Sequence, residues 1–388
     1  MKHAEAVVSA RGAKRWADGH AWIFRSDVMQ VPDGPPGAVG VRDPRGRPLG
    51  WGLWSPSSEI ALRLLDQNAS ATIDGAWWHA RIARAIQRRA GLDGVATAYR
   101  MVHGEGDGLP SLVVDRYDRW IVVQLLSAGL EASRALIVDA LQSLARPSGI
   151  LARNDASVRT RESLVREVET LVGDVPDEVT VEEHGVRYMA ALRTGQKTGA
   201  FLDQRENRAL IGARARGRSL DLFSYHGSFA LHLARGSAQV TAVDVSAAAL
   251  ERGRSNAALN GLTNIDFVEA DAFEFLRAQR GGAPYDTIVV DPPAFAKNRA
   301  SLPGAVRGYR DLNLHAMRLL APGGLLFTAS CSYHLSKPAF LDMVRDASAE
   351  SGRRMILRAI TAQPVDHPEV ITVPETGYLK GALLEALD

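Results

Sequence analysis

A thiol and a carboxylate each follow an apolar run in the second half of the chain. Cys331, the only cysteine, lies just beyond the apolar residues 325–327, and Asp291 lies directly after residues 288–290 and before two prolines. Short apolar runs bounded in this way predict buried strands. Because ligands bind outside the carboxyl ends of parallel strands, we expect both groups to face one site. A thiol in such a site can act as a nucleophile.

Length and composition predict a soluble protein of two or three domains. The 388 residues exceed one ordinary core, and a content of 46% hydrophobic and 23% charged residues is typical of globular proteins. A single cysteine excludes an internal disulfide and a cysteine-based metal cluster, so we expect no metal and a reducing, cytoplasmic compartment. The first thirty residues lack the apolar core of a secretion signal, and no apolar stretch is long enough to span a membrane.

The basic residues are clustered, although the net charge is only +2. Residues 11–16 place an aromatic ring beside cations, a combination that suits unpaired RNA bases. Further clusters at residues 81–89 and 214–218 are more typical of a solvated helix face or loop. The N-terminal module also resembles the PUA domain, a β-barrel that binds structured RNA, and this resemblance implies RNA contacts by Arg11, Lys14, Arg15 and Trp16.

Three segments with different patterns divide the chain. Residues 1–72 contain short β-rich runs between dense turn signals, which predicts a small β-barrel. Residues 73–190 form an expected central α+β domain, because a helical pattern over 73–89 is followed by mixed strand and helix signals. In that domain we expect strands at 111–115 and 120–125 and a helix near 131–145. The third segment, residues 191–388, alternates strands and helices from residue 219 onward.

The third segment predicts an α/β fold with a Rossmann-like, doubly wound sheet of seven strands. Strands that alternate with helices are joined by right-handed crossovers, which give a parallel sheet with helices on both faces. The expected strands are residues 219–223, 240–245, 265–268, 287–290, 325–329, 355–359 and 381–387.

Acidic residues close three consecutive strands of this sheet. Asp244 ends the second strand and can accept hydrogen bonds from two ribose hydroxyls. Asp271 follows the third strand and can accept a hydrogen bond from an adenine amino group, while Phe273 covers the face of the adenine ring. Asp291 closes the fourth strand. The first turn, residues 221–228, holds one glycine and no lysine, so it is neither a dinucleotide fingerprint nor a phosphate-binding loop. Each acid taken alone is equally compatible with a helix N-cap.

This succession of residues resembles the class I S-adenosylmethionine-dependent methyltransferases. In that family the corresponding positions hold, in turn, the methionine moiety, the ribose, the adenine and the target base. The resemblance therefore implies S-adenosylmethionine as the cofactor. The positions implied to bind it are Asp221, Phe223, Ser224, Tyr225, Gly227, Ser228, Asp244, Asp271, Phe273, Asp291 and Pro292.

A thiol beside a methyl donor points to carbon 5 of a pyrimidine as the methyl acceptor. Carbon 5 is a weak nucleophile, and a thiolate that adds to carbon 6 converts it into an enamine-like centre able to attack the methyl group. An amino nitrogen or a ribose oxygen needs no such covalent step. The alternative interpretation of Cys331 is a buried packing residue at the end of a strand.

Longer motifs occur at residues 103–110, 195–208, 221–227, 291–295, 330–332, 366–368 and 374–381. Together they resemble a family of bacterial 23S ribosomal RNA methyltransferases that carry an N-terminal PUA domain and produce 5-methylcytosine. The resemblance implies that Cys331 is the nucleophile and that Asp291 orients or protonates the ring at nitrogen 3. It also implies that Phe201, Gln204 and Arg205 line the cofactor, and that the N-terminal barrel binds 23S ribosomal RNA.

Two other functions stay open at this point. A guanine N-methyltransferase on the same fold is the first, because the Asp-Pro-Pro start at residue 291 also resembles amino-group methylases. A non-catalytic RNA-binding or ribosome-assembly factor is the second. The general base that removes the carbon 5 proton is also left open. Candidates for this base, or for contact with phosphate, are Lys297, His334 and Lys337. The sequence also permits a homodimer. A target nucleotide within an RNA duplex must be flipped out before Cys331 can reach its carbon 6.

Overall fold

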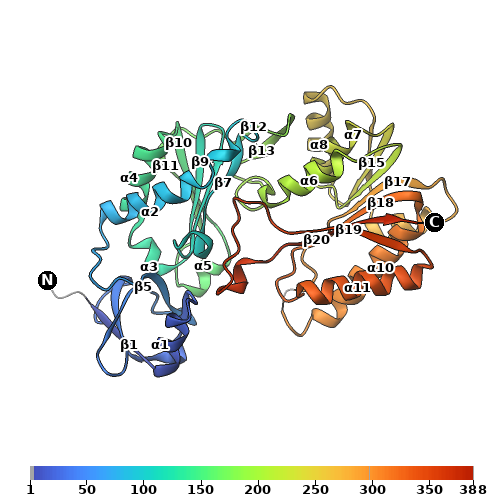
Figure 1. Cartoon of the computed structure of the whole chain (residues 1–388). Coiled ribbons are helices and arrows are strands. Elements are labelled where there is room, and N and C mark those ends of the chain that lie inside the picture. Colours follow the sequence, from blue (N-terminus) through green and yellow to red (C-terminus); the bar gives the residue numbers. More distant parts are fainter. Residues whose placement is uncertain (1–3, 297, 388) are drawn as a thin grey trace. The chain divides into compact units, whose positions relative to one another are not determined.

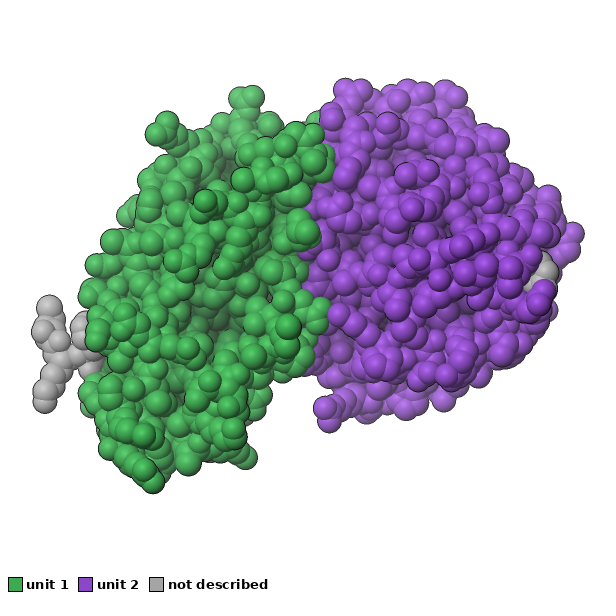
Figure 2. Space-filling view, viewed as in Figure 1, with its two compact units in different colours: residues 1–181, 190–202, 365–376 green, residues 182–189, 203–364, 377–388 purple. Residues whose placement is uncertain are grey.

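The computed structural model describes residues 4–296 and 298–387. The chain forms two compact units, which Figure 2 colours separately. The first unit comprises Met1–Val181, Ala190–Leu202 and Val365–Thr376, and the second comprises Glu182–Met189, Asp203–Pro364 and Gly377–Asp388. The division into three domains at residues 72 and 190 stays a prediction. None of the described helices has both the length and the apolar character needed to cross a membrane.

The first unit begins with a six-stranded sheet in the order β2-β6-β5-β4-β1-β3. Figure 1 draws this part of the chain in blue. Its elements are β1 (Glu5–Val8), α1 (Ala10–Ala17), β2 (Trp22–Phe24), η1 (Arg25–Asp27), β3 (Val28–Gln30), β4 (Gly37–Arg42), β5 (Pro48–Trp54) and β6 (Ile60–Asp66). Ser9 caps α1 by accepting a hydrogen bond from the Gly12 amide. The apolar faces of the strands enclose Trp16, Ile23 and Val39. The β-rich architecture expected for this segment is confirmed.

The rest of the first unit is built on a five-stranded sheet in the order β11-β10-β9-β8-β7. Its elements are α2 (Gly75–Gln87), η2 (Ala90–Leu92), β7 (Ala98–His103), η3 (Gly104–Asp107), β8 (Leu112–Tyr117), β9 (Trp120–Leu125), α3 (Ala128–Glu131), α4 (Arg134–Ala145), β10 (Gly149–Asn154), α5 (Val158–Arg161), β11 (Glu167–Gly173) and η5 (Pro374–Thr376). Trp51, Leu53 and Leu65 of the preceding sheet pack into the same apolar core as this sheet. The two sheets of this unit therefore share buried surface. A hairpin of β12 (Glu178–Glu183) and β13 (Val186–Ala191) follows.

The second unit contains a seven-stranded sheet in the order β16-β15-β14-β17-β18-β20-β19. Its strands are β14 (Arg218–Leu222), β15 (Gln239–Asp244), β16 (Ile265–Glu269), β17 (Tyr285–Val290), β18 (Leu320–Ser330), β19 (Met355–Thr361) and β20 (Lys380–Ala386). β20 runs antiparallel to both of its neighbours, and the pairs from β16 to β18 are parallel. All seven strands predicted from the apolar runs are confirmed. The strand order reverses between β14 and β17, the position at which such sheets bind ligands.

Helices cover both faces of this sheet, as the doubly wound prediction requires. They are η4 (Leu202–Gln204), α6 (Arg205–Gly212), α7 (Ser228–Ala234), α8 (Ala247–Leu259), α9 (Ala272–Ala278), α10 (Leu302–Arg318) and α11 (Lys337–Ser351). Figure 1 shows α7 and α8 on one face and α10 and α11 on the other. Within β17, Ile288 and Val290 pack against α10, and Val289 packs in the cluster on the opposite face with Phe229 of α7.

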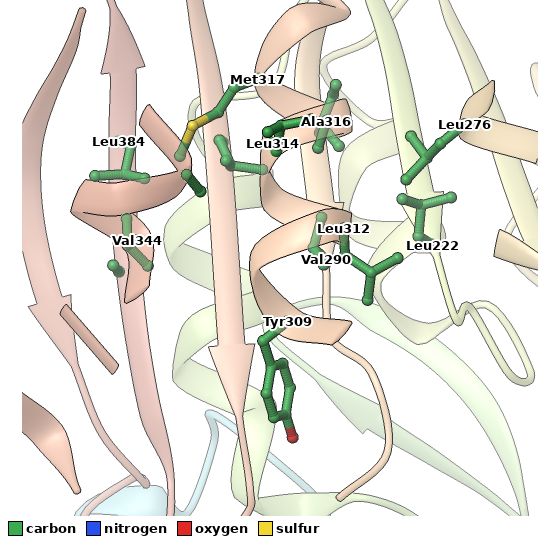
Figure 3. Packing of buried hydrophobic residues seen from close by; sticks show 14 of the residues in the cluster. Leu222, Leu276, Val290, Tyr309, Leu312, Leu314, Ala316, Met317, Val344 and Leu384 are labelled. Carbon is green, nitrogen blue, oxygen red and sulfur yellow. The ribbon is translucent and has the colours of Figure 1, made fainter. Parts of the chain in front are cut away.

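The apolar core beneath α10 also positions the phenol group of Tyr309 near the edge where the strands end. Leu222, Val290 and Leu312 are fully buried, and burial of each such side chain contributes about 1.5–3 kcal/mol. Tyr309 lies at the end of this cluster with its hydroxyl oxygen directed away from the aliphatic side chains (Figure 3). The ring is therefore packed as a core residue while its hydroxyl is available to the loops beyond the strands.

Candidate active site

Four adjacent strands bring the predicted chemical groups to one edge of the second unit. Asp244 ends β15, Asp221 lies one residue before the end of β14, Asp291 directly follows β17, and Cys331 directly follows β18. The strands are in register there, because Leu222 is paired with Val243 and Val290, and Val290 with Thr328. The expectation that the thiol and the carboxylate share one sheet edge is confirmed by this topology.

The turn at residues 221–228 has an unusual backbone. Phe223 and Tyr225 have left-handed φ values of 62° and 50°, and Gly227 has a φ of 81°. A non-glycine residue in this region costs of the order of 1 kcal/mol, so the surroundings must hold the turn in place. The Ser224 amide donates to the Val243 carbonyl at 3.0 Å, and the Tyr225 amide donates to Asp244 Oδ2 at 2.9 Å. The turn is thus fixed onto the end of β15.

Asp221 and Ser224 each place a buried polar atom at this turn. Asp221 Oδ2 accepts the Ala230 amide at 2.9 Å, in the first turn of α7. Asp221 Oδ1 and Ser224 Oγ are both buried and have no hydrogen-bond partner among the described residues. Leaving such an atom unsatisfied costs about 1–3 kcal/mol, which a ligand with hydrogen-bonding groups removes. These atoms fit the polar amino-acid end of S-adenosylmethionine.

Burial raises the pKa of Asp221 well above its usual value of 3.8, and the negative charges of Asp291 and Asp244 add to the increase. At pH values above the usual carboxyl pKa, Asp221 therefore stays protonated in the folded, cofactor-free protein, whereas it is ionised in the unfolded chain. The contribution of Asp221 to the free energy of unfolding is fully present below its usual pKa. That contribution is lost as the pH rises through the pKa of Asp221 in the folded state.

We predict that Asp221→Asn removes this pH dependence. Urea unfolding without cofactor, at several pH values from 4.5 to 8, should show the wild-type free energy of unfolding falling relative to that of the variant as the pH rises. The asparagine oxygen can still accept the Ala230 amide, so the comparison isolates the ionisation. Parallel curves for the two proteins would contradict the prediction.

The acids after β15 and β16 are partly used as local anchors. Asp244 accepts the Ser246 amide at 2.9 Å through Oδ1, in addition to the Tyr225 amide. Asp271 is the N-cap of α9 and accepts the amides of Phe273 and Glu274 through Oδ1 alone. The N-cap alternative therefore holds for Asp271, while its Oδ2 accepts no hydrogen bond within the described part of the chain. Cofactor contacts of both acids stay predictions.

Three aromatic rings lie beside the predicted adenine position. The rings of Phe273 and Phe295 are stacked with centroids 6.4 Å apart, and Phe223 meets Phe295 edge-on at 6.5 Å. All three are partly buried against the core of the sheet. Phe295 was not singled out as a cofactor residue, although its place after the two prolines was a usable signal. At the start of α7, Gly227 is the N-cap and Ser228 the first helical residue.

The motif at residues 195–208 contacts Asp291 through the amide of Gln204. The buried Gln204 donates from Nε2 to Asp291 Oδ1 at 2.8 Å, and its Oε1 accepts from Asn207 Nδ2 at 2.6 Å. This pair of bonds fixes the amide orientation and leaves the half-buried carboxylate of Asp291 in a defined position. Pro292, the next residue, is buried.

The other two loop residues predicted to line the cofactor have contacts of their own. Arg205 is fully buried, and its guanidinium binds Glu206 at 2.9 Å. Phe201 belongs to the first unit, where Lys197 Nζ lies 4.6 Å from its ring centroid. The roles of both residues at the cofactor stay predictions.

A hydrogen-bonded network connects the loop after β17 with the turn after β18. The Tyr309 hydroxyl is 2.8 Å from Ser332 Oγ and accepts the Phe295 amide at 3.3 Å. Ser332 Oγ also accepts the Ala296 amide at 3.2 Å. Cys331, the residue before Ser332, is half-buried and packs against the apolar cluster that contains Ala329 and Leu379. Tyr309 was missed from the sequence because no local motif marks a buried phenol in the middle of a helix.

The three candidate bases lie in different settings. Lys297 falls outside the described residues. His334 is half-buried, with its ring 5.2 Å from the ring of Tyr333 in an edge-on arrangement. Lys337 is exposed and is the first residue of α11.

The predicted RNA-binding residues lie on and around α1 in the first unit. The side chains of Arg11 and Lys14 are 73% and 77% exposed, and they pair with Asp27 and Asp18. Arg15 is half-buried, with its guanidinium 4.6 Å from the ring centroid of Phe24.

The structure contradicts the prediction that Trp16 contacts RNA. It is only 2% exposed and packs in the core of the first sheet, so its indole cannot stack on an RNA base. Its position on the apolar face of α1, rather than its basic neighbours in the sequence, decided its environment.

The sheet order and the site together define a class I S-adenosylmethionine-dependent methyltransferase. A family model described as S-adenosylmethionine-dependent methyltransferase matches residues 100–379, and a PUA-like domain model matches residues 7–67. The cofactor is therefore S-adenosylmethionine. The expected PUA-like architecture of the N-terminal segment is confirmed as well.

Curated relatives refine this assignment. The ribosomal RNA large subunit methyltransferase I of Aeromonas salmonicida is 40% identical over 378 residues, covering 95% of each chain. The protein of the same name from Tolumonas auensis is 40% identical over 379 residues, covering 95% of this chain and 96% of its own. The chain belongs to the ribosomal RNA large subunit methyltransferase I family.

Solved structures agree on the fold. An S-adenosylmethionine-dependent methyltransferase from Streptococcus mutans superimposes with a TM-score of 0.83 at 20% identity, covering 98% of this chain and 99% of that one. A methyltransferase structure complexed with SAH reaches a TM-score of 0.84 at 20% identity with the same coverage.

Proposed function

We propose that the protein transfers a methyl group from S-adenosylmethionine to carbon 5 of a cytosine in 23S ribosomal RNA, with Cys331 as the covalent nucleophile. Membership of the family supports ribosomal RNA methylation. The choice of carbon 5 rests on one observation: the only thiol follows β18, at the edge where Asp221, Asp244 and Asp291 follow or end the neighbouring strands.

The chemistry uses the thiol to make the pyrimidine reactive. The Cys331 thiolate adds to carbon 6, and the electrons of the carbon 5–carbon 6 double bond move toward the carbonyl and nitrogen 3 of the ring. The bound cofactor supplies an electrophilic methyl group. Carbon 5 takes this methyl, a base removes the carbon 5 proton, and the electrons returned to the ring expel the thiolate. The products are 5-methylcytosine, S-adenosylhomocysteine and one proton.

Asp291 is suited to the ring nitrogen in this scheme. Charge that develops at nitrogen 3 during thiolate addition is stabilised by a proton or a hydrogen bond from a fixed acid. The Gln204 amide holds one oxygen of the Asp291 carboxyl group at 2.8 Å. The same contact restricts rotation of the Asp291 side chain, so its second carboxyl oxygen points in a fixed direction.

The N-terminal PUA-like domain supplies a surface for the RNA. Arg11 and Lys14 are highly exposed, and such cations attract the phosphate backbone without reading its sequence. The target cytosine must be unstacked before carbon 6 can reach a half-buried thiol, so a loop or a flipped nucleotide is the expected substrate. We infer that the enzyme acts in the cytoplasm, where bacterial ribosomal RNA is found.

Nucleoside mass spectrometry of 23S ribosomal RNA tests the proposal. RNA from cells lacking the gene, treated with the purified protein and labelled S-adenosylmethionine, should gain one labelled 5-methylcytidine per molecule. Labelled methylguanosine would instead support the guanine N-methyltransferase. RNA binding with no label transferred to RNA, either naked or in ribosomal particles, would support the non-catalytic assembly factor. Either of those results would overturn the cytosine proposal.

A further inference from the structure

A buried lysine lies beside the turn that carries Cys331. Lys380 is the first residue of β20, and its backbone is paired with Ser330, the last residue of β18. The residue is only 3% exposed, which is rare for a lysine. Its ammonium donates to the carbonyl of Ser332 at 2.6 Å and to the carbonyl of Tyr378 at 2.8 Å. A cation therefore binds the backbone one residue beyond the thiol.

The electrostatic surroundings of this ammonium contain one anionic partner. The pKa of Lys380 is lowered to about 8, mainly by burial and to a smaller extent by the charge of Lys337. The charge of the Cys331 thiolate acts in the opposite sense and favours the ammonium. Tyr309, whose hydroxyl lies 2.8 Å from Ser332 Oγ, has a pKa raised by burial and is neutral at physiological pH.

The polar geometry of Lys380 is incomplete without a further acceptor. An ammonium has three N–H donors, and two of them bind the carbonyls of Ser332 and Tyr378. Within residues 4–296 and 298–387 the third has no hydrogen-bond partner. A buried cation held by neutral carbonyls is stabilised by a nearby anion, and the thiolate is the anion that this site can produce.

We propose that Lys380 is a positioning residue that holds the turn after β18 and stabilises the Cys331 thiolate with its positive charge. The inference rests on the proposed function, because it concerns the group that acts there as the nucleophile. The reciprocal attraction keeps both members charged: the cation favours loss of the thiol proton, and the resulting thiolate favours retention of the lysine proton.

The reactivity of the thiol tests this inference without RNA or cofactor. Cys331 is the only cysteine, so iodoacetamide labelling of the intact protein followed by mass spectrometry reports on that residue alone. In Lys380→Met we expect the pH midpoint of alkylation to rise by about one unit, and the rate at pH 7 to fall by about tenfold. Lys380→Arg keeps the charge and should stay within about threefold of the wild type at pH 7.

A matched control removes a different cation from the same sheet. Arg358 lies on β19, where it is half exposed and pairs with Glu385 of β20. Arg358→Met should leave the alkylation profile of Cys331 unchanged. If the midpoint is the same in wild type and a folded Lys380→Met protein, the charge role of Lys380 is refuted. If Lys380→Met does not fold, Lys380→Gln, which loses the charge but keeps a donor, replaces it, and a midpoint equal to that of Lys380→Arg refutes the role.

The outcome separates this inference from the proposed function. Methyl transfer by Cys331→Ala at the wild-type rate would remove the covalent mechanism, yet the alkylation profiles of the lysine variants would still decide the charge coupling. Conversely, unchanged alkylation in Lys380→Met would refute the role of Lys380 and leave Cys331 as the nucleophile. In active variants we expect the rate of the chemical step, rather than KM for RNA, to fall.

Discussion

Replacing Cys331 by alanine should reduce methyl transfer by about 10⁴-fold or more, because the covalent route to carbon 5 disappears with its nucleophile. Tritium release from RNA labelled at carbon 5 of cytosine measures the step directly. Binding of S-adenosylmethionine, followed by calorimetry, should change little, since the polar atoms that fit the cofactor belong to Asp221 and Ser224.

A trapping experiment sharpens this prediction. RNA that carries 5-fluorocytosine at the target position cannot lose the carbon 5 substituent as a proton, so the wild-type enzyme should remain attached to it on a denaturing gel. Cys331→Ala should form no such adduct, whereas Tyr333→Phe, a change on an exposed neighbour, should form it normally. Tritium release at the wild-type rate from the alanine variant would show that Cys331 is a packing residue.

Asp291→Asn is the second substitution with a large expected effect. The amide oxygen can still accept from Gln204 Nε2, so the local structure should persist while the ionisable carboxyl group is lost. We expect the single-turnover rate at saturating RNA to fall by about 10²–10³-fold, the usual contribution of a positioned acid. The free energy of unfolding should change by about 1 kcal/mol or less.

The control for this change is Asp266→Asn on β16. Asp266 is exposed and accepts a surface hydrogen bond from Gln239, so this variant should retain the wild-type rate. Quench-flow measurements with both variants distinguish loss of chemistry from loss of folding. A wild-type single-turnover rate in Asp291→Asn would remove Asp291 from the reaction and leave it as a structural partner of Gln204.

The architecture of the catalytic half follows from local sequence patterns. Apolar runs such as residues 288–290 are buried on both faces of a parallel sheet, and this requirement is visible in the chain without any tertiary contact. The position of Asp291 and Cys331 at one edge follows from the same pattern, because parallel strands point their carboxyl ends in one direction. A site at this edge could therefore be predicted before the fold was known, and its resemblance to the class I S-adenosylmethionine-dependent methyltransferases implied the cofactor class.

The environment of each site residue was decided only by the tertiary structure. Gln204 meets Asp291 across 87 positions of sequence, and Lys380 meets the Ser332 carbonyl across 48. Trp16 illustrates the same limit, since its basic neighbours predicted RNA contact and its burial excluded it. A residue's type and spacing report local periodicity, whereas burial, hydrogen-bond partners and charge coupling depend on segments that become neighbours only when the sheet assembles.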